Sequence, residues 1–218
     1  MLHTFFTLLI CINGMNSWLT QATSESYTWY NEPTQWSSNS SAIMVHTNGE
    51  TDFWRQTHYG FERDNGHFYY RSMNGEQSFT ITVNVYGNYR VVYDQAGLML
   101  RNDAHNWIKC GIEYVDGIYY ASAVVTVNGW SDWSVVPLSQ NPNPLRLRVK
   151  REREAVHIEY AESENHPFTM MRLAYLPLAK KTNPIMIGIM CASPNEKTDG
   201  FDVIFDELNI TKHQSNGD

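Results

Sequence analysis

Alternation between apolar and polar side chains is the feature that most restricts the fold of this chain. From Ser78 to Tyr86, apolar residues occupy every odd position and mostly polar residues the even ones. A period of two places the apolar side chains on one face of a β-strand. The same pattern recurs in Gly97–Arg101, Trp107–Val115, Tyr119–Val127, Leu145–Lys150, Ala155–Tyr160, Met170–Tyr175, Ile185–Cys191 and Phe201–Ile210. We therefore expect about nine strands.

Turn dipeptides separate several of these segments. Such pairs tolerate positive φ angles and predict antiparallel neighbours; they are Asn65-Gly66, Asn74-Gly75, Asp116-Gly117 and Asn128-Gly129. Pro142 and Pro144 cannot donate ladder hydrogen bonds, so they predict a connection between strands. No segment has an amphipathic helical stripe with caps. These features predict an all-β chain, a jelly-roll sandwich of two antiparallel sheets.

We expect one domain, a β-sandwich over residues 27–212, followed by a tail at 213–218. Residues 1–26 are interpreted as an extension or a weak signal-like segment, because the apolar run Phe5–Ile12 is not preceded by Lys or Arg. If residues 1–22 act as a signal peptide, the protein is secreted; otherwise we expect it in the cytoplasm. Cys110 and Cys191 lie in apolar runs and are expected to be buried free thiols.

Composition excludes several classes of protein. The net charge of −7 argues against nucleic-acid binding, which needs clustered Lys and Arg. No apolar run is long enough for a membrane span. There is no zinc-like spacing of Cys and His, and calcium would need Asp52, Asp64, Asn65 or Asp202 to converge with further oxygen ligands. We expect no metal and no cofactor.

The densest group of aromatic and polar residues runs from Thr51 to His67. If this segment is extended, Asp52, Trp54 and His58 share one face, and Arg55 and Tyr59 share the other. Aromatic rings beside hydrogen-bonding groups suit a sugar, whose C–H face stacks on a ring. The alternative is that Trp54 and Tyr59 fill a wide sandwich and His58 is a core-edge imidazole.

A second group combines Asp94 and Gln95 with the segment Trp107–Val115. Within that segment Trp107, Lys109, Gly111 and Glu113 share one face, where the glycine leaves room for a ligand. The alternative is a solvated outer face with an ion pair between Lys109 and Glu113 that contributes about 0.5 kcal/mol.

The segment Trp130–Ser134 is interpreted as a loop with two indoles. Trp133 would either line the rim of a cleft or close one end of the sandwich. Glycoside hydrolysis needs two carboxyl groups roughly 5 to 9.5 Å apart, and the cross-strand pair Asp94 and Glu113 is the candidate for that role. No nucleophile-elbow, phosphate-loop or dinucleotide motif is present.

Several linked segments resemble one family when taken together in order: Trp29-Tyr30-Asn31-Glu32-Pro33, Thr51 to His67, Tyr93 to Met99, Gly111 to Gly117, Ser131-Asp132-Trp133-Ser134 and Met190 to Pro194. They are similar to the regulation-of-enolase protein family, small concanavalin-like domains of unknown function. The resemblance covers about Trp29 to Ile210. It implies a jelly-roll sandwich like that of legume lectins and glucanases, usually a free-standing cytoplasmic protein, with a yeast member linked to control of enolase and galactose metabolism.

The resemblance implies no catalytic residues. The Glu-x-Asp-x-x-Glu pattern of related concanavalin-like glucanases is absent from Gly111 to Gly117, which counts against a hydrolase. A shared fold does not supply a function by itself.

We expect a non-enzymatic, lectin-like protein that binds a carbohydrate or sugar phosphate, contacts a metabolic enzyme such as enolase, or does both. The alternatives are a glycan-active hydrolase using Asp94 and Glu113, and a structural interaction domain without a small ligand, which would expose an apolar patch. The expected ligand-binding residues are Asp52, Trp54, Arg55, His58, Tyr59, Asp94, Gln95, Trp107, Glu113 and Trp133.

Overall fold

The computed structural model describes residues 26–179, 183–196 and 198–213. These residues form sixteen strands: β1 (Thr28–Tyr30), β2 (Gln35–Ser38), β3 (Ala42–His46), β4 (Phe53–Arg55), β5 (Glu62–Asp64), β6 (His67–Met73), β7 (Phe79–Gly87), β8 (Gln95–Asp103), β9 (Asn106–Val115), β10 (Ile118–Val127), β11 (Trp130–Pro137), β12 (Leu145–Glu152), β13 (Ala155–Ala161), β14 (Thr169–Tyr175), β15 (Ile185–Ala192) and β16 (Asp202–Lys212). The expected signal-like segment lies outside the described residues, apart from Ser26.

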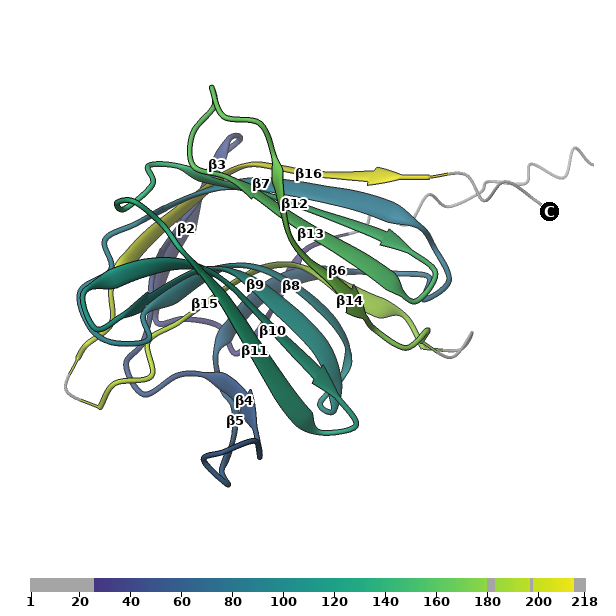
Figure 1. Cartoon of the computed structure of the whole chain (residues 1–218), viewed down its shortest axis with the longest axis horizontal. Helices are drawn as coiled ribbons and strands as arrows, with labels where there is room; N and C mark the ends of the chain where they lie inside the picture. Colours follow the sequence, from purple (N-terminus) through teal and green to yellow (C-terminus); the bar gives the residue numbers. More distant parts are fainter. Residues whose placement is uncertain (1–25, 180–182, 197, 214–218) are drawn as a thin grey trace, which may run out of the picture.

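Fourteen of the strands build two stacked antiparallel sheets (Figure 1). One sheet, which we call the front sheet, has the order β1-β6-β15-β8-β9-β10-β11, and the other, the back sheet, has the order β14-β13-β12-β7-β16-β3-β2. In Figure 1, β8 to β11 of the front sheet are drawn below β7, β12 and β16 of the back sheet. The remaining pair, β4 and β5, forms a separate hairpin. The expected fold class, an all-β sandwich of two antiparallel sheets, is confirmed.

The core lies between the two sheets. Leu98, Leu100 and Ile108 of the front sheet and Ile81 and Val149 of the back sheet are fully buried there and belong to one apolar cluster. Their spacing of two along each strand is the alternation seen in the sequence. The free energy gained by burying these side chains therefore specifies which face of each sheet turns inward.

All nine expected strands are present, as β7 to β10 and β12 to β16. The sequence pattern did not reveal the short strands β1 to β5, nor β6. The interpretation of Trp130–Ser134 as a loop is wrong, because these residues begin β11 and pair with β10. These residues do not alternate between apolar and polar types in the sequence, so the pattern did not indicate a strand. In the structure Ser131 is buried and its neighbours are exposed.

Two of the four turn dipeptides join antiparallel neighbours as expected. Asp116-Gly117 connects β9 to β10, Asn128-Gly129 connects β10 to β11, and all four residues have positive φ angles. Asn65-Gly66 and Asn74-Gly75 instead connect strands that do not pair with each other, because β5 belongs to the small hairpin and β6 and β7 lie in different sheets. A turn signal alone does not specify the partner of the next strand.

Three further findings concern the described part of the chain. That part contains no helix capable of crossing a membrane. It also contains no cluster of three or more His, Cys, Asp or Glu side chains suited to a metal ion. Within it, Cys110 and Cys191 are free and buried.

Candidate functional site

The β4–β5 hairpin lies against the outer face of the front sheet, the face turned away from the core (Figure 1). Phe53 of β4 is fully buried in a second apolar cluster with Phe68, Met99 and Trp107 of the front sheet. The ring centroids of Phe53 and Trp107 are 6.2 Å apart. Burial of this phenyl ring anchors the hairpin on the sheet.

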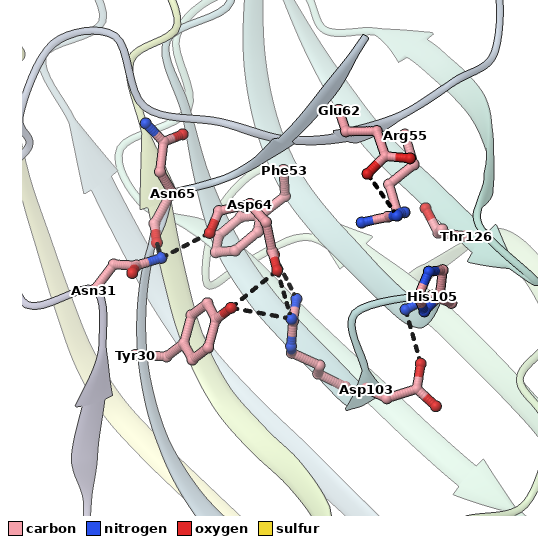
Figure 2. Close-up of polar contacts among 12 residues, drawn as sticks. Tyr30, Asn31, Phe53, Arg55, Glu62, Asp64, Asn65, Asp103, His105 and Thr126 are labelled. Atoms are coloured by element: carbon pink, nitrogen blue, oxygen red, sulfur yellow. Dashed lines mark hydrogen bonds and ion pairs between the residues drawn. The ribbon is translucent and has the colours of Figure 1, made fainter. Parts of the chain in front are cut away.

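An ion pair attaches β5 of the hairpin to the front sheet. The guanidinium of Arg101 donates to both carboxylate oxygens of Asp64, at 2.7 and 2.8 Å. The hydroxyl of Tyr30 donates to the same carboxylate at 2.9 Å, as Figure 2 shows. Arg101 is buried, and a bidentate pair of this kind also restricts orientation.

Arg55 attaches β4 of the hairpin to the front sheet. Its backbone N–H donates to the hydroxyl of Ser131 at 2.9 Å, and that hydroxyl shares a hydrogen bond with Thr126. Its guanidinium donates to Glu62 at 2.7 Å (Figure 2). Arg55 therefore joins the hairpin to the edge of the front sheet, which is a positioning role.

The loop between β4 and β5 is compact rather than extended. Gln56 and His58 both have positive φ angles, and the N–H of Gln56 donates to the carbonyl of Phe61 at 2.9 Å. The extended conformation, on which the expected sharing of faces depended, therefore ends at Arg55. The fold-back brings the Tyr59 ring to 5.7 Å from Trp54 and 5.5 Å from Phe61, measured between centroids.

A pocket of about 290 Å³ lies between this hairpin and the outer face of the front sheet. This volume is just below the usual range for small-molecule sites, roughly 300 to 1,000 Å³. Aromatic rings and charged groups both contribute to its wall. The lining residues are Glu50, Asp52, Trp54, Tyr59, Phe61, Arg63, Tyr93, Gln95, Lys109, Glu113, Val124, Trp133 and Pro194.

Strand register brings the front-sheet residues of the pocket together. Gln95 of β8 lies opposite Glu113 of β9, and Val124 of β10 lies opposite both Lys109 of β9 and Trp133 of β11. Paired residues share a face of a sheet, so these five side chains project from the same side.

A buried ion pair forms one part of the pocket wall. The ammonium of Lys109 donates to the carboxylate of Asp52 at 3.1 Å and to the amide oxygen of Gln95 at 2.6 Å. Lys109 and Gln95 are both buried. The ion pair considered between Lys109 and Glu113 is therefore replaced by one with Asp52, which arrives from the hairpin.

Glu113 forms another part of the wall. Its Oε2 atom accepts hydrogen bonds from the hydroxyl of Ser122 at 2.6 Å and from the indole of Trp133 at 3.0 Å. Burial raises the pKa of Glu113, while the nearby Lys109 ammonium and the bond from Ser122 oppose that rise. A carboxyl group of this kind keeps its proton to higher pH than an exposed one and can then donate a hydrogen bond.

Tyr93 borders the pocket at its outer side. Its hydrogen bond with Tyr59, with burial as a second cause, raises the pKa of Tyr93 to about 12. Tyr93 also has a φ of 71°, a conformation that is strained for a residue with a bulky side chain. The phenol therefore stays protonated and offers a fixed polar edge.

Six of the ten residues expected at the site line the pocket: Asp52, Trp54, Tyr59, Gln95, Glu113 and Trp133. Arg55, His58, Asp94 and Trp107 do not. Trp107 lies on the expected face, but Phe53 covers it. His58 is exposed and packs against Tyr59, because the loop turns back after Arg55.

Asp94 faces away from the pocket. Its carboxylate accepts hydrogen bonds from the N–H groups of Arg90 and Val91 and, at 2.6 Å, from the hydroxyl of Ser193. Gln95 is the residue paired with Glu113, so Asp94, one position earlier, points to the opposite face. This geometry removes Asp94 and Glu113 as a facing carboxylate pair.

Seven lining residues were not among those expected: Glu50, Phe61, Arg63, Tyr93, Lys109, Val124 and Pro194. Phe61 and Arg63 belong to the dense aromatic stretch, Lys109 shares the face of Glu113, and Tyr93 directly precedes Asp94 and Gln95, so these four carried a signal in the sequence. Glu50, Val124 and Pro194 carried none, because they are brought to the pocket by loop packing and strand pairing.

Most of the chain is similar in sequence to one protein family and to a relative from yeast. Residues 29–213 match a family described as "Protein of unknown function (DUF1349)". The protein named Regulation of enolase protein 1 of Saccharomyces cerevisiae is 37% identical over 184 residues, which cover 84% of this chain and 88% of that protein.

Two solved structures show where the fold recurs. A functionally unknown protein from Saccharomyces cerevisiae superposes with a TM-score of 0.78 and 36% identity, covering 86% of this chain and 97% of that one. A GH43 protein from Bacillus licheniformis superposes with a TM-score of 0.63 at 14% identity, covering 86% of this chain and 37% of that one. The second likeness is one of fold alone.

Proposed function

This chain belongs to the DUF1349 family, whose function is unknown, and we propose that it binds a neutral carbohydrate in the pocket between the β4–β5 hairpin and the front sheet. The family resemblance inferred from the sequence is confirmed by the 37% identity with the yeast protein. The observation that carries the proposal is the set of rings from Trp54, Tyr59 and Trp133 beside buried hydrogen-bonding groups.

The chemistry of the wall suits a sugar ring. Trp54, Tyr59 and Trp133 present apolar surfaces on which the C–H face of a pyranose can stack. Gln95, Lys109 and Glu113 are buried beside them and supply donors and acceptors for hydroxyl groups. Within the described residues, no protein group donates to Oε1 of Glu113, which leaves this oxygen for a ligand hydroxyl.

The electrostatics favour a neutral sugar over a sugar phosphate. The positive charge of Lys109 is already balanced by the Asp52 carboxylate, so it adds little attraction for a phosphate. Glu50 adds a further carboxylate to the lining, and Arg63 is the remaining cation in the described lining. A phosphate dianion placed there would meet like charges, which destabilise binding.

Titration calorimetry with neutral mono- and oligosaccharides, preceded by a glycan array, tests the proposal. Trp133→Ala is expected to weaken binding at least tenfold, because it removes a stacking surface and the indole hydrogen bond to Glu113. Trp130→Ala is the matched control, since Trp130 lies on the same strand, is 63% exposed and does not line the pocket. Absence of saturable binding to any neutral sugar would overturn the proposal.

Hydrolysis is a separate outcome of the same experiment. The pocket carboxyl groups nearest to Lys109 are those of Asp52 and Glu113. The Asp52 carboxylate forms an ion pair with the Lys109 ammonium, so it is not a free base or nucleophile. We therefore propose binding without turnover. Release of reducing ends from an oligosaccharide that binds, abolished in Glu113→Gln, would show a hydrolase instead.

A regulatory contact with enolase is a second candidate function. It is supported by the name of the yeast relative and the 84% of this chain that aligns with it. Mixing purified enolase with this protein is expected to change the KM or kcat of enolase. The same change with Trp133→Ala would separate that contact from the pocket, and no change with wild-type protein would remove this candidate.

A further inference from the structure

A second hollow adjoins the pocket at the surface. It has a volume of about 740 Å³ and extends to Asn65 and Glu196. Its lining shares four residues with the pocket: Glu50, Arg63, Tyr93 and Pro194. The two spaces therefore adjoin along these four residues, and we call the pair together the long groove.

The long groove changes character along its length. At the inner end Gln95, Lys109 and Glu113 are buried and hydrogen-bonded. At the outer end Asn65 and Glu196 are exposed. A ligand that occupies both ends therefore has one enclosed unit and further units that are open to solvent, as in a chain bound by its terminus.

Tyr93 stands where the two spaces meet. It borders both, its phenol is hydrogen-bonded to Tyr59, and its backbone φ is 71°. A strained conformation at a ligand-facing residue is retained only where the surrounding structure imposes it, and such residues concentrate at functional sites. Its ring offers a stacking surface between an inner and an outer sugar unit.

The charge of the long groove selects among sugar chains. Its described lining holds four carboxyl groups, from Glu50, Asp52, Glu113 and Glu196, and two cationic groups. Of the cations, Lys109 is paired with Asp52, and the guanidinium of Arg63 lies over the Phe61 ring at 5.0 Å from its centroid. Uronate or sulfated chains would meet excess negative charge.

We propose that the long groove binds a neutral oligosaccharide of at least two units. The terminal unit lies among Trp54, Tyr59 and Trp133, and the next unit passes Tyr93 toward Glu196. This inference rests on the proposed function, because it extends the same pocket, and it adds both the length and the charge class of the ligand.

Calorimetry with length series tests the inference. The probes are glucose and xylose, their β-1,4-linked di-, tri- and tetrasaccharides, and the mannose series, each compared with oligogalacturonates of equal length. We expect at least a tenfold gain in affinity from mono- to tetrasaccharide in one neutral series. We also expect the oligogalacturonates to bind at least tenfold more weakly.

One substitution separates the outer end from the pocket. Glu196 lines the outer hollow and not the inner pocket. Glu196→Ala is expected to lower tetrasaccharide affinity at least threefold and to leave monosaccharide affinity unchanged. Glu154→Ala, at an exposed carboxylate outside both linings, is the matched control.

The outcomes distinguish the inference from the proposed function. Equal affinity for mono- and tetrasaccharides would overturn the long groove and leave the sugar pocket in place. Oligogalacturonates that bind as tightly as neutral chains would overturn the charge argument. No binding of a neutral sugar at any length would overturn the proposed function and this inference together.

Discussion

Replacing Lys109 by Met is predicted to destabilise the folded protein through the carboxylate it leaves behind. The ammonium donates to Asp52 and Gln95, and the Lys109 and Asp52 side chains are 6% and 15% exposed. Met has a similar volume and no charge, so the substitution leaves the mostly buried Asp52 carboxylate without its positively charged partner. Its remaining hydrogen bonds come from its neighbour's backbone N–H, at 2.7 Å, and from Gln95, at 3.2 Å.

The magnitude follows from that burial. Breaking a buried ion pair by removing one partner costs about 3 to 5 kcal/mol. Because Asp52 keeps two hydrogen bonds and some exposure, we expect the lower end, about 3 kcal/mol. For a domain of this size, about 2 to 4 °C accompanies each kcal/mol, so the melting temperature should fall by roughly 6 to 12 °C.

A double-mutant cycle measured by urea unfolding at neutral pH tests this reasoning. Asp52→Asn combined with Lys109→Met should recover most of the lost stability, since no buried charge is left unpaired. Lys150→Met is the matched control, because its salt bridge with Glu152 is exposed. A double variant whose destabilisation equals the sum of the two single losses would show that the pair is not coupled and would refute the argument.

Three further predictions concern the hairpin, the pocket carboxyl and the thiols. Phe53→Ala should cost about 3 to 5 kcal/mol and should speed amide exchange in the β4–β5 hairpin first, because it removes the ring packed on Trp107; uniform acceleration across the front sheet would contradict this. The raised pKa of Glu113 means that the folded state holds a proton the unfolded state has lost, so stability should fall as pH rises from the ordinary value of 4.5 through the folded pKa. The unfolding free energy of Glu113→Gln, measured with urea, should not show this fall with rising pH. Identical pH profiles for the variant and the wild-type protein would refute the prediction. Burial raises the pKa of Cys110 to about 12 and that of Cys191 further, so peptide mapping should find neither modified by a thiol reagent until urea unfolds the chain.

Part of the candidate site was predictable because it lies on one strand or in one dense segment. Lys109 and Glu113 are four positions apart on β9, an even offset, so their shared face follows from the strand period alone. Trp54 and Tyr59 were recognised from local aromatic density. Their contact with each other was not, because it depends on positive φ angles at Gln56 and His58 that residue type did not indicate.

The incorrect site predictions, for Asp94 and Trp107, depend on contacts between segments that the sequence pattern does not specify. Asp94 is the cross-strand partner of Glu113 expected from the sequence, but the strand register gives that place to Gln95, one residue later. Trp107 lies on the predicted face but is covered, because the hairpin packs against that part of the sheet.

Alternation along the chain was sufficient to specify the layers, since the burial of every second side chain is a local property that each strand carries within itself. The tertiary structure decided where the pocket lies, because Asp52 reaches Lys109 across 57 positions and Trp133 reaches Glu113 across 20. Contacts over such separations depend on register and on how a hairpin is seated, and neither is encoded in the period of a single strand.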